Sequence, residues 1–130
     1  MLTIYRVEDE GGLGPYVNLH STDAWTETSH VNLDRTPGPG EDTIVGGSSC
    51  LALHINGADR FGFANLEQLC SWFVEQERRN LDRLGFKISV YEVPCRDAIC
   101  TSKQVAFRRG DRQPIAKISL LDAGLHAKAA

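Results

Sequence analysis

A helix with clear start and stop signals, set between two strands, is the feature that most constrains how this chain can fold. Asn65 is followed three residues later by Gln68, which is typical of a capping box at a helix start. Gly85 stands where a helix ends, and Phe86 can pack back on the last turn. The apolar residues between these signals recur at helical spacing: Leu66, Leu69, Cys70, Phe73, Val74, Leu81 and Leu84. We therefore expect one principal helix over about residues 65–84, with one face packed on a sheet.

Strand-like segments flank this helix. Residues 60–63, Arg-Phe-Gly-Phe, form a short candidate strand before it, and the β-rich segment Lys87–Val93 follows it and is stopped by Pro94. Residues 60–94 are therefore predicted to form a strand–helix–strand unit. Because this unit buries an apolar stripe, we expect it to serve as a structural scaffold. Only Trp72 or the polar face of residues 75–80 is then expected to contact a partner.

The first segment of the chain also predicts a strand. Over Leu2–Glu8 the side chains alternate, which places Arg6 on the same face as the apolar Leu2 and Ile4. Residues 11–15, Gly-Gly-Leu-Gly-Pro, end this strand in a turn.

The middle of the chain is rich in Gly, Pro, Ser, Thr, Asp and Asn. Residues 16–49 are expected to be irregular, with at most a short helix near residue 21, and residues 36–40 exclude regular structure. A long loop of this kind is either a binding loop or a disordered insertion. Residues 50–55 form a short apolar element before Asn56-Gly57, and both a buried strand and a turn of helix fit it.

The last third predicts further antiparallel pairing. Residues 104–107, Gln-Val-Ala-Phe, form a candidate strand, and the short connection suggests that it pairs with Lys87–Val93. Residues 115–121 add a last strand or helix. The predicted fold class is α+β: one domain over residues 1–122, mainly antiparallel, with a loop-rich first half and a flexible tail over residues 123–130.

Length and composition agree with a single core in a soluble chain. The 130 residues are 42% hydrophobic and 24% charged, and no apolar stretch approaches the roughly 20 residues needed to cross a bilayer. The first residues lack the basic-then-apolar order of a secretory signal, so a cytoplasmic location is expected.

A reducing compartment favours free thiols at all four cysteines: Cys50, Cys70, Cys95 and Cys100. Their spacing and that of the histidines match no zinc pattern, so no metal site is expected, and a disulfide between Cys95 and Cys100 remains the alternative. The net charge of −3 disfavours direct nucleic-acid binding. Neither a phosphate loop nor a Gly-x-Ser-x-Gly or His-Glu-x-x-His motif is present.

The order of the elements resembles that of ADP-ribosyltransferases. In that family an early strand carries an arginine or histidine that helps to hold NAD, a central strand offers an aromatic or Ser/Thr position, and a late strand carries a catalytic glutamate. The resemblance implies NAD as cofactor, with Arg6, Tyr5, Phe61 and Phe63 as its contacts. The candidate catalytic residues are Arg6, Gln104 and Glu92.

Gln104 departs from this pattern, because it stands where the glutamate is expected. A neutral amide donates and accepts hydrogen bonds but supplies no charge to stabilise the transition state as nicotinamide leaves. An arginine can still hold a diphosphate, so nucleotide binding without turnover is an open alternative. Arg6 also has a purely structural interpretation, as the partner of an ion pair, with Glu92 as the expected carboxylate.

The sequence also resembles small accessory proteins of bacteriophages and prophages. The residues that carry this resemblance are Tyr-Arg-Val-Glu at 5–8, Leu-Gly-Pro-Tyr at 13–16, the Gly-Phe to Trp-Phe segment at 62–73 and Val-Tyr-Glu-Val at 90–93. It implies a phage setting. Small size, the loop-rich first half and the lack of an intact catalytic set then favour a phage counter-defence protein of the anti-CRISPR type. Such a protein inhibits a host defence protein or complex by direct binding and needs no cofactor.

Three functions therefore remain open: this inhibitor, an NAD-dependent mono-ADP-ribosyltransferase that modifies a host protein, and a nucleotide-binding module without turnover. For the two nucleotide-dependent functions the expected site is a cleft between Arg6 and Gln104. Residues 61–64 would form its floor, and the loop of residues 11–49 would close it.

Overall fold

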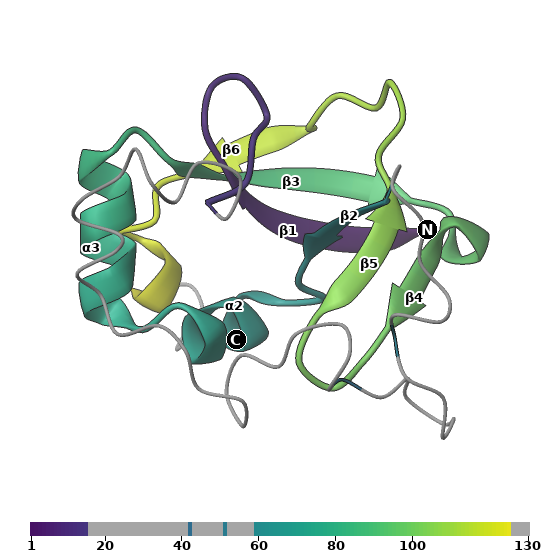
Figure 1. Ribbon diagram of the computed structural model, residues 1–130, viewed down its shortest axis with the longest axis horizontal. Helices are drawn as coiled ribbons and strands as arrows, with labels where there is room; N and C mark the ends of the chain where they lie inside the picture. Colours follow the sequence, from purple (N-terminus) through teal and green to yellow (C-terminus); the bar gives the residue numbers. More distant parts are fainter. Residues whose placement is uncertain (16–41, 43–50, 52–58, 126–130) are drawn as a thin grey trace.

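The computed structural model describes residues 1–15, 42, 51 and 59–125. These residues form two three-stranded antiparallel sheets with the helices α2 and α3 (Figure 1). This arrangement confirms the α+β class and its antiparallel pairing. The irregular region and short helix expected over residues 16–49 lie outside the described residues, apart from Asp42. The same is true of the apolar element of residues 50–55, apart from Leu51.

The first sheet has the order β1-β3-β6 and contains the predicted first strand. β1 (Leu2–Glu8) pairs along its whole length with β3 (Lys87–Val93), from Leu2 opposite Val93 to Glu8 opposite Lys87. β6 (Ala116–Ile118) pairs with the other edge of β3. Both a strand and a helix were open for residues 115–121, and the structure forms a strand there over Ala116–Ile118.

The second sheet has the order β2-β5-β4 and corrects one predicted pairing. β5 (Val105–Arg108) lies between β2 (Asp59–Gly62) and β4 (Ala98–Cys100), so it pairs with these two strands and not with β3. The reason is the connection. After β3, Pro94 and the 3₁₀ turn η3 (Cys95–Asp97) redirect the chain, and β4 and β5 then form a hairpin of their own.

The two sheets meet directly after β2. Phe63 and Tyr5 exchange two backbone hydrogen bonds of 2.8 Å, which connect the chain leaving β2 to the middle of β1. Gly62 makes this approach possible. A Cβ atom at Gly62 would lie 2.6 Å from Cγ2 of Ile4 and 2.9 Å from the carbonyl oxygen of Tyr5, closer than real Cβ contacts allow.

The single principal helix expected over residues 65–84 is wrong, because the structure has two consecutive helices, α2 (Leu66–Trp72) and α3 (Glu75–Arg83). Val74 is extended, with φ −69° and ψ 168°, and the chain turns there. The carboxylate of Glu77 accepts the N–H of Val74 at 2.9 Å, so a second cap starts α3.

The predicted start and stop signals are confirmed. Oδ1 of Asn65 accepts the N–H of Gln68 at 2.8 Å, and Oε1 of Gln68 accepts the N–H of Ala64 at 2.8 Å. Gly85 has a φ of +94°, and the N–H of Phe86 returns to the carbonyl of Leu81 at 3.0 Å.

The β1–β3 pair has an apolar core on each face. On one face Val7 and Ile88 pack with residues from the helices, including Leu69, Trp72 and Leu81. On the other face Ile4, Tyr91 and Val93 pack with Val105 and Phe107 of the second sheet. The order of layers is therefore helices, first sheet, second sheet.

The expected contact surface changes accordingly. Trp72 is 7% exposed and packs against Phe63, with ring centroids 5.6 Å apart, so it is a core residue. Glu77 and Asn80, within the supposedly exposed face of residues 75–80, are also buried.

The end of the described chain is packed too. Ala123 was placed in the predicted tail, but it is fully buried in the helix-side core with Leu120. The division into a domain and a tail stays a prediction, since residues 126–130 lie outside the described part.

The described cysteines, Cys70, Cys95 and Cys100, carry free thiols, so the alternative Cys95–Cys100 disulfide is not formed. Burial raises the pKa of the Cys70 and Cys100 thiols, which works against a nucleophilic thiolate. Cys50 lies outside the described residues. Within the described part, no three His, Cys, Asp or Glu side chains gather in a way that could hold a metal ion. None of the described helices has the length and apolar character that crossing a membrane requires.

Candidate functional site

Arg6 is the best-defined candidate residue, and the structure places it in a buried ion pair. It lies in β1 on the face toward the second sheet and is only 6% exposed. Its Nε donates to Oε2 of Glu8 at 3.0 Å, and its Nη1 donates to the carbonyl of Phe61 at 2.8 Å. The expected pair with Glu92 is wrong. Glu92 stands opposite Thr3, on the other face of the sheet, and is exposed.

Tyr91 and Arg109 extend this pair into a network. The hydroxyl of Tyr91 donates to Oε1 of Glu8 at 2.6 Å and accepts from Nε of Arg109 at 3.0 Å. The Arg109 guanidinium also lies 5.6 Å from the centre of the Tyr91 ring, within cation–π range. Burial lowers the pKa of Arg6, against the opposing effect of Glu8. Burial and the hydrogen bond to Glu8 raise the pKa of Tyr91.

The glycines of residues 11–15 leave room for these two arginines. A Cβ atom at Gly12, where φ is +82°, would lie 3.2 Å from Nη2 of Arg109, and one at Gly14 would lie 3.1 Å from Nη2 of Arg6. The carboxylate of Asp9 accepts the N–H groups of Gly11 and Leu13, at 2.8 and 3.0 Å. The loop is therefore a turn with internally satisfied donors, in contrast to a phosphate cradle, whose donors face the ligand.

Gln104 belongs to a different buried cluster. Its Nε2 donates to Oδ2 of Asp42 at 2.8 Å, and the hydroxyl of Thr101 lies 2.8 Å from the same oxygen. Thr101 Oγ1 also accepts the N–H of Gln104 at 2.9 Å. This cluster fixes the turn between β4 and β5 and attaches Asp42 to it. Among the contacts of the described residues, it shares no hydrogen-bond partner with Arg6.

The aromatic candidates do not surround Arg6 either. Tyr5 and Phe63 pack in the helix-side core, on the opposite face of β1 from Arg6. Phe61 meets Arg6 through its backbone carbonyl. The candidate residues thus divide between two faces of the sheet and two hydrogen-bonded clusters, and the single cleft drawn from the sequence does not form among the described residues.

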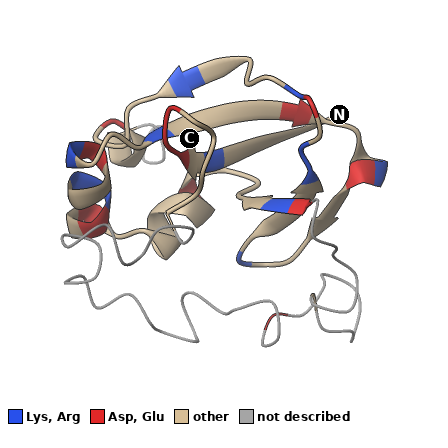
Figure 2. Cartoon of the chain, turned by 45° about the horizontal axis from the view of Figure 1, so that its top comes forward, with Lys and Arg blue, Asp and Glu red and all other residues tan. Residues whose placement is uncertain are grey.

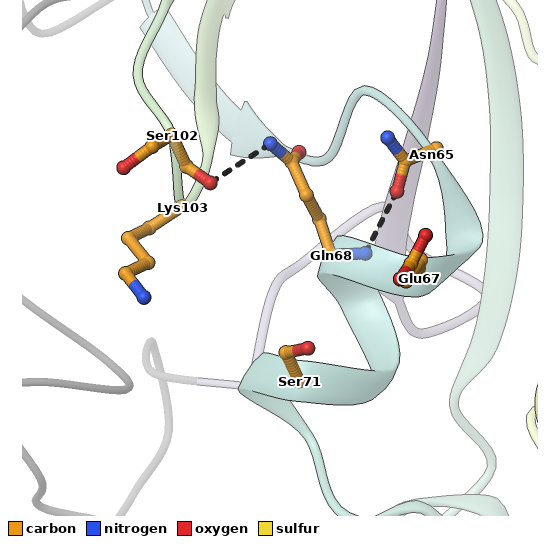
Figure 3. A pocket seen from close by; sticks show the side chains of 6 residues that line it. All are labelled: Asn65, Glu67, Gln68, Ser71, Ser102 and Lys103. Atoms are coloured by element: carbon orange, nitrogen blue, oxygen red, sulfur yellow. Dashed lines mark hydrogen bonds between the residues drawn. The ribbon is translucent and has the colours of Figure 1, made fainter.

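A recess elsewhere in the described part was missed from the sequence. It has a volume of about 230 Å³ and lies between α2 and the β4–β5 turn (Figure 3). Its lining residues are Asn65, Glu67, Gln68, Ser71, Ser102 and Lys103. The capping pair Asn65 and Gln68 was the only signal in the sequence, because the other four residues have the composition of ordinary polar surface.

The charges outside these clusters are mixed. Figure 2 shows lysines and arginines interspersed with acidic residues on α3 and on the strands. Arg79 pairs with Glu75 and Arg112 with Asp97, both at 2.8 Å. The described part therefore presents pairs of opposite charge on its surface, which are of small energetic weight when exposed.

Comparison with known proteins places the chain in a phage family. The family model described as Bacteriophage T4 Y00F protein matches residues 1–121, so the chain belongs to that family. A relative from Enterobacteria phage T4, described as an uncharacterized 19.7 kDa protein in the motB-dexA intergenic region, is 41% identical over 49 residues. The matched segment covers 38% of this chain and 30% of that protein. No solved structure matches.

The family confirms the resemblance to small phage proteins and is consistent with an accessory role. The family match shows neither an anti-CRISPR activity nor a relation to ADP-ribosyltransferases.

Proposed function

We propose that the chain is a phage accessory protein of the counter-defence type, which binds a host defence protein in the host cytoplasm and blocks it without chemistry of its own. The observation that carries the proposal is the engagement of the candidate catalytic side chains. Arg6 is held by Glu8 and Phe61, and Gln104 is held by Asp42.

Releasing either residue for catalysis would carry an energetic penalty. Withdrawing Arg6 would leave Glu8 buried without its ion-pair partner, and withdrawing Gln104 would remove a donor from the buried carboxylate of Asp42. Buried charges that lose a partner destabilise a protein by several kcal/mol. Function by surface contact requires neither rearrangement.

The transferase alternative rests on the element-order resemblance, and Gln104 weighs against it. Its amide nitrogen donates to Asp42, and it supplies no negative charge to a departing nicotinamide. Incubation of the chain with a host lysate and labelled NAD separates the two functions. The inhibitor account predicts no transferred label. Label that is lost with Arg6→Ala, in protein shown by its spectrum to be folded, and that is kept with the exposed control Glu75→Gln would establish the transferase.

The nucleotide-binding alternative is tested by calorimetry with NAD and related dinucleotides. The inhibitor account predicts no heat of binding at millimolar ligand. A saturable titration would instead favour a nucleotide-binding module, with Arg6 as the first residue to substitute.

The proposal itself is tested by plaque assays in host strains that differ only in one defence system. Expression of the chain should restore plaquing of a sensitive phage in one defended strain and change nothing in the undefended strain. The purified chain should then form a stoichiometric complex with a component of that system. Absence of restored plaquing across a broad panel of systems would contradict the proposal.

A further inference from the structure

The two walls of the recess, α2 and the β4–β5 turn, are hydrogen-bonded to each other. The side chain of Gln68 connects them: its Oε1 accepts from the backbone of Ala64 at 2.8 Å, and its Nε2 donates to the carbonyl of Ser102 at 3.1 Å (Figure 3). A site whose walls are already held loses less conformational entropy when it binds a ligand.

The turn that forms the second wall is fixed from below. Thr101 Oγ1 accepts the N–H groups of Lys103 and Gln104, at 3.1 and 2.9 Å. The buried carboxylate of Asp42 accepts from the side chain of Gln104. The backbone that carries Ser102 and Lys103 is therefore set by a buried cluster, and their side chains stand exposed above it.

The recess is lined by one negatively and one positively charged side chain, Glu67 and Lys103, which do not pair with each other. Within the described residues, the carboxylate of Glu67, the hydroxyl of Ser71 and the ammonium of Lys103 make no hydrogen bond or ion pair. Figure 3 shows Lys103 extending from the turn on one side, with Glu67 and Ser71 on the helix on the other. A purely anionic ligand would be repelled by Glu67, and a purely cationic ligand by Lys103.

We propose that this recess binds a small zwitterion, a ligand that carries one carboxylate and one ammonium group, as a free amino acid or a dipeptide does. Lys103 and the hydroxyl of Ser102, both from the turn, bind the carboxylate. Glu67 binds the ammonium group, and the hydroxyl of Ser71 on the same helix accepts a further hydrogen bond from it. The volume of about 230 Å³ is below the roughly 300–1,000 Å³ of drug-sized sites, which suits a ligand of this size. The site is independent of the proposed inhibitor function.

Nuclear magnetic resonance titration of the full chain tests the proposal, with glycine and glycylglycine as zwitterions and with acetate and ethylammonium as singly charged probes. We expect saturable shifts at the amides of Ser71, Ser102 and Lys103 with at least one zwitterion. Each singly charged probe should bind more weakly than the zwitterion by a factor of about ten or more, because it gains only one of the two ion pairs. Tighter binding of glycine indicates free amino acids, and tighter binding of glycylglycine indicates dipeptides.

Two substitutions and their matched controls complete the test. Glu67→Gln and Lys103→Met should each weaken zwitterion binding about tenfold. Glu75→Gln and Lys117→Met remove the same charges from exposed positions outside the recess, so they should leave the affinity for the zwitterion unchanged. The dispersion of each variant's spectrum reports whether it is folded. The proposal is overturned if neither zwitterion gives saturable shifts, if the singly charged probes bind as tightly, or if the controls weaken binding as much as the recess variants.

Discussion

At the scale of single residues, the central finding is that Arg6 serves the fold. Arg6 lies on the same face of β1 as Leu2 and Ile4, in apolar surroundings. An arginine is tolerated there because Glu8, the next residue on that face, pairs with it at 3.0 Å. Buried ion pairs depend on their partners far more than exposed ones do.

Glu8→Ala should therefore destabilise the chain by about 3–5 kcal/mol, because it leaves the Arg6 charge buried and unpaired. The double substitution Arg6→Met with Glu8→Leu should recover most of that loss, since it removes both charges. Urea unfolding of the wild type, Arg6→Met, Glu8→Leu and the double variant measures the coupling, and Glu8→Ala is unfolded in parallel. If Glu8→Ala lowers stability by less than about 1 kcal/mol, the pair behaves like an exposed one and this account of Arg6 is wrong.

Tyr91 predicts how stability depends on alkaline pH. Its pKa is raised in the folded state by burial and by Glu8, so above about pH 10 the unfolded chain loses this proton while the folded chain keeps it. The folded state then binds more protons, and its stability falls as pH rises. The stabilising contribution is fully present below about pH 10 and is lost as pH rises through the raised folded pKa.

Unfolding free energies of the wild type and Tyr91→Phe, measured between pH 7 and a strongly alkaline pH, test this. We expect the variant to be less stable at pH 7, because it loses two hydrogen bonds, and to have a flatter decline above about pH 10. Parallel curves for the two proteins would show that Tyr91 does not contribute to the alkaline loss.

At the scale of elements, the local signals in the sequence were accurate and their tertiary consequences were less so. The cap at Asn65, the stop at Gly85 and the two long strands β1 and β3 of the first sheet could be predicted, because each depends on neighbouring residues. The break between α2 and α3 could not. The apolar stripe continues through Phe73 and Val74, and only the reach of Glu77 back to Val74 shows a second helix start.

The pairing of β5 was missed for a similar reason. A short connection favours pairing of consecutive strands, and here the consecutive partner of β5 is the three-residue β4, which was absent from the prediction. The contact between the two sheets likewise depends on Gly62, whose spatial neighbours Ile4 and Tyr5 are distant in sequence.

Gly62→Ala tests that contact. The new Cβ would meet Ile4 at 2.6 Å and the backbone of Tyr5 at 2.9 Å, and backbone cannot move as a flexible side chain can. We expect a loss of about 1–3 kcal/mol or more in the free energy of unfolding, the range typical of overpacking. Gly11→Ala is the matched control and should change the stability little, because its Cβ would lie 3.4 Å from Oδ1 of Asp9, an ordinary contact with a side chain. Equal stability of both variants would refute the tight contact.

At the scale of the whole molecule, the candidate site shows where prediction from the sequence ends. Asp42 lies 62 residues from Gln104 in sequence, and no local pattern connects the two. The side of the sheet on which Phe63 packs is set by the crossing at Gly62, which periodicity does not reveal. Family membership gives the phage setting, and two of the three candidate catalytic residues, Arg6 and Gln104, hold buried parts of the fold together.

The most direct test of the central claim is the intact mass and activity of a host defence protein that the chain inhibits, measured after incubation with the chain and NAD. The account predicts a stoichiometric complex, loss of the defence activity and an unchanged mass of the defence protein once the complex is dissociated. Inhibition that persists after dissociation, with the mass raised by an attached ADP-ribose, would contradict it.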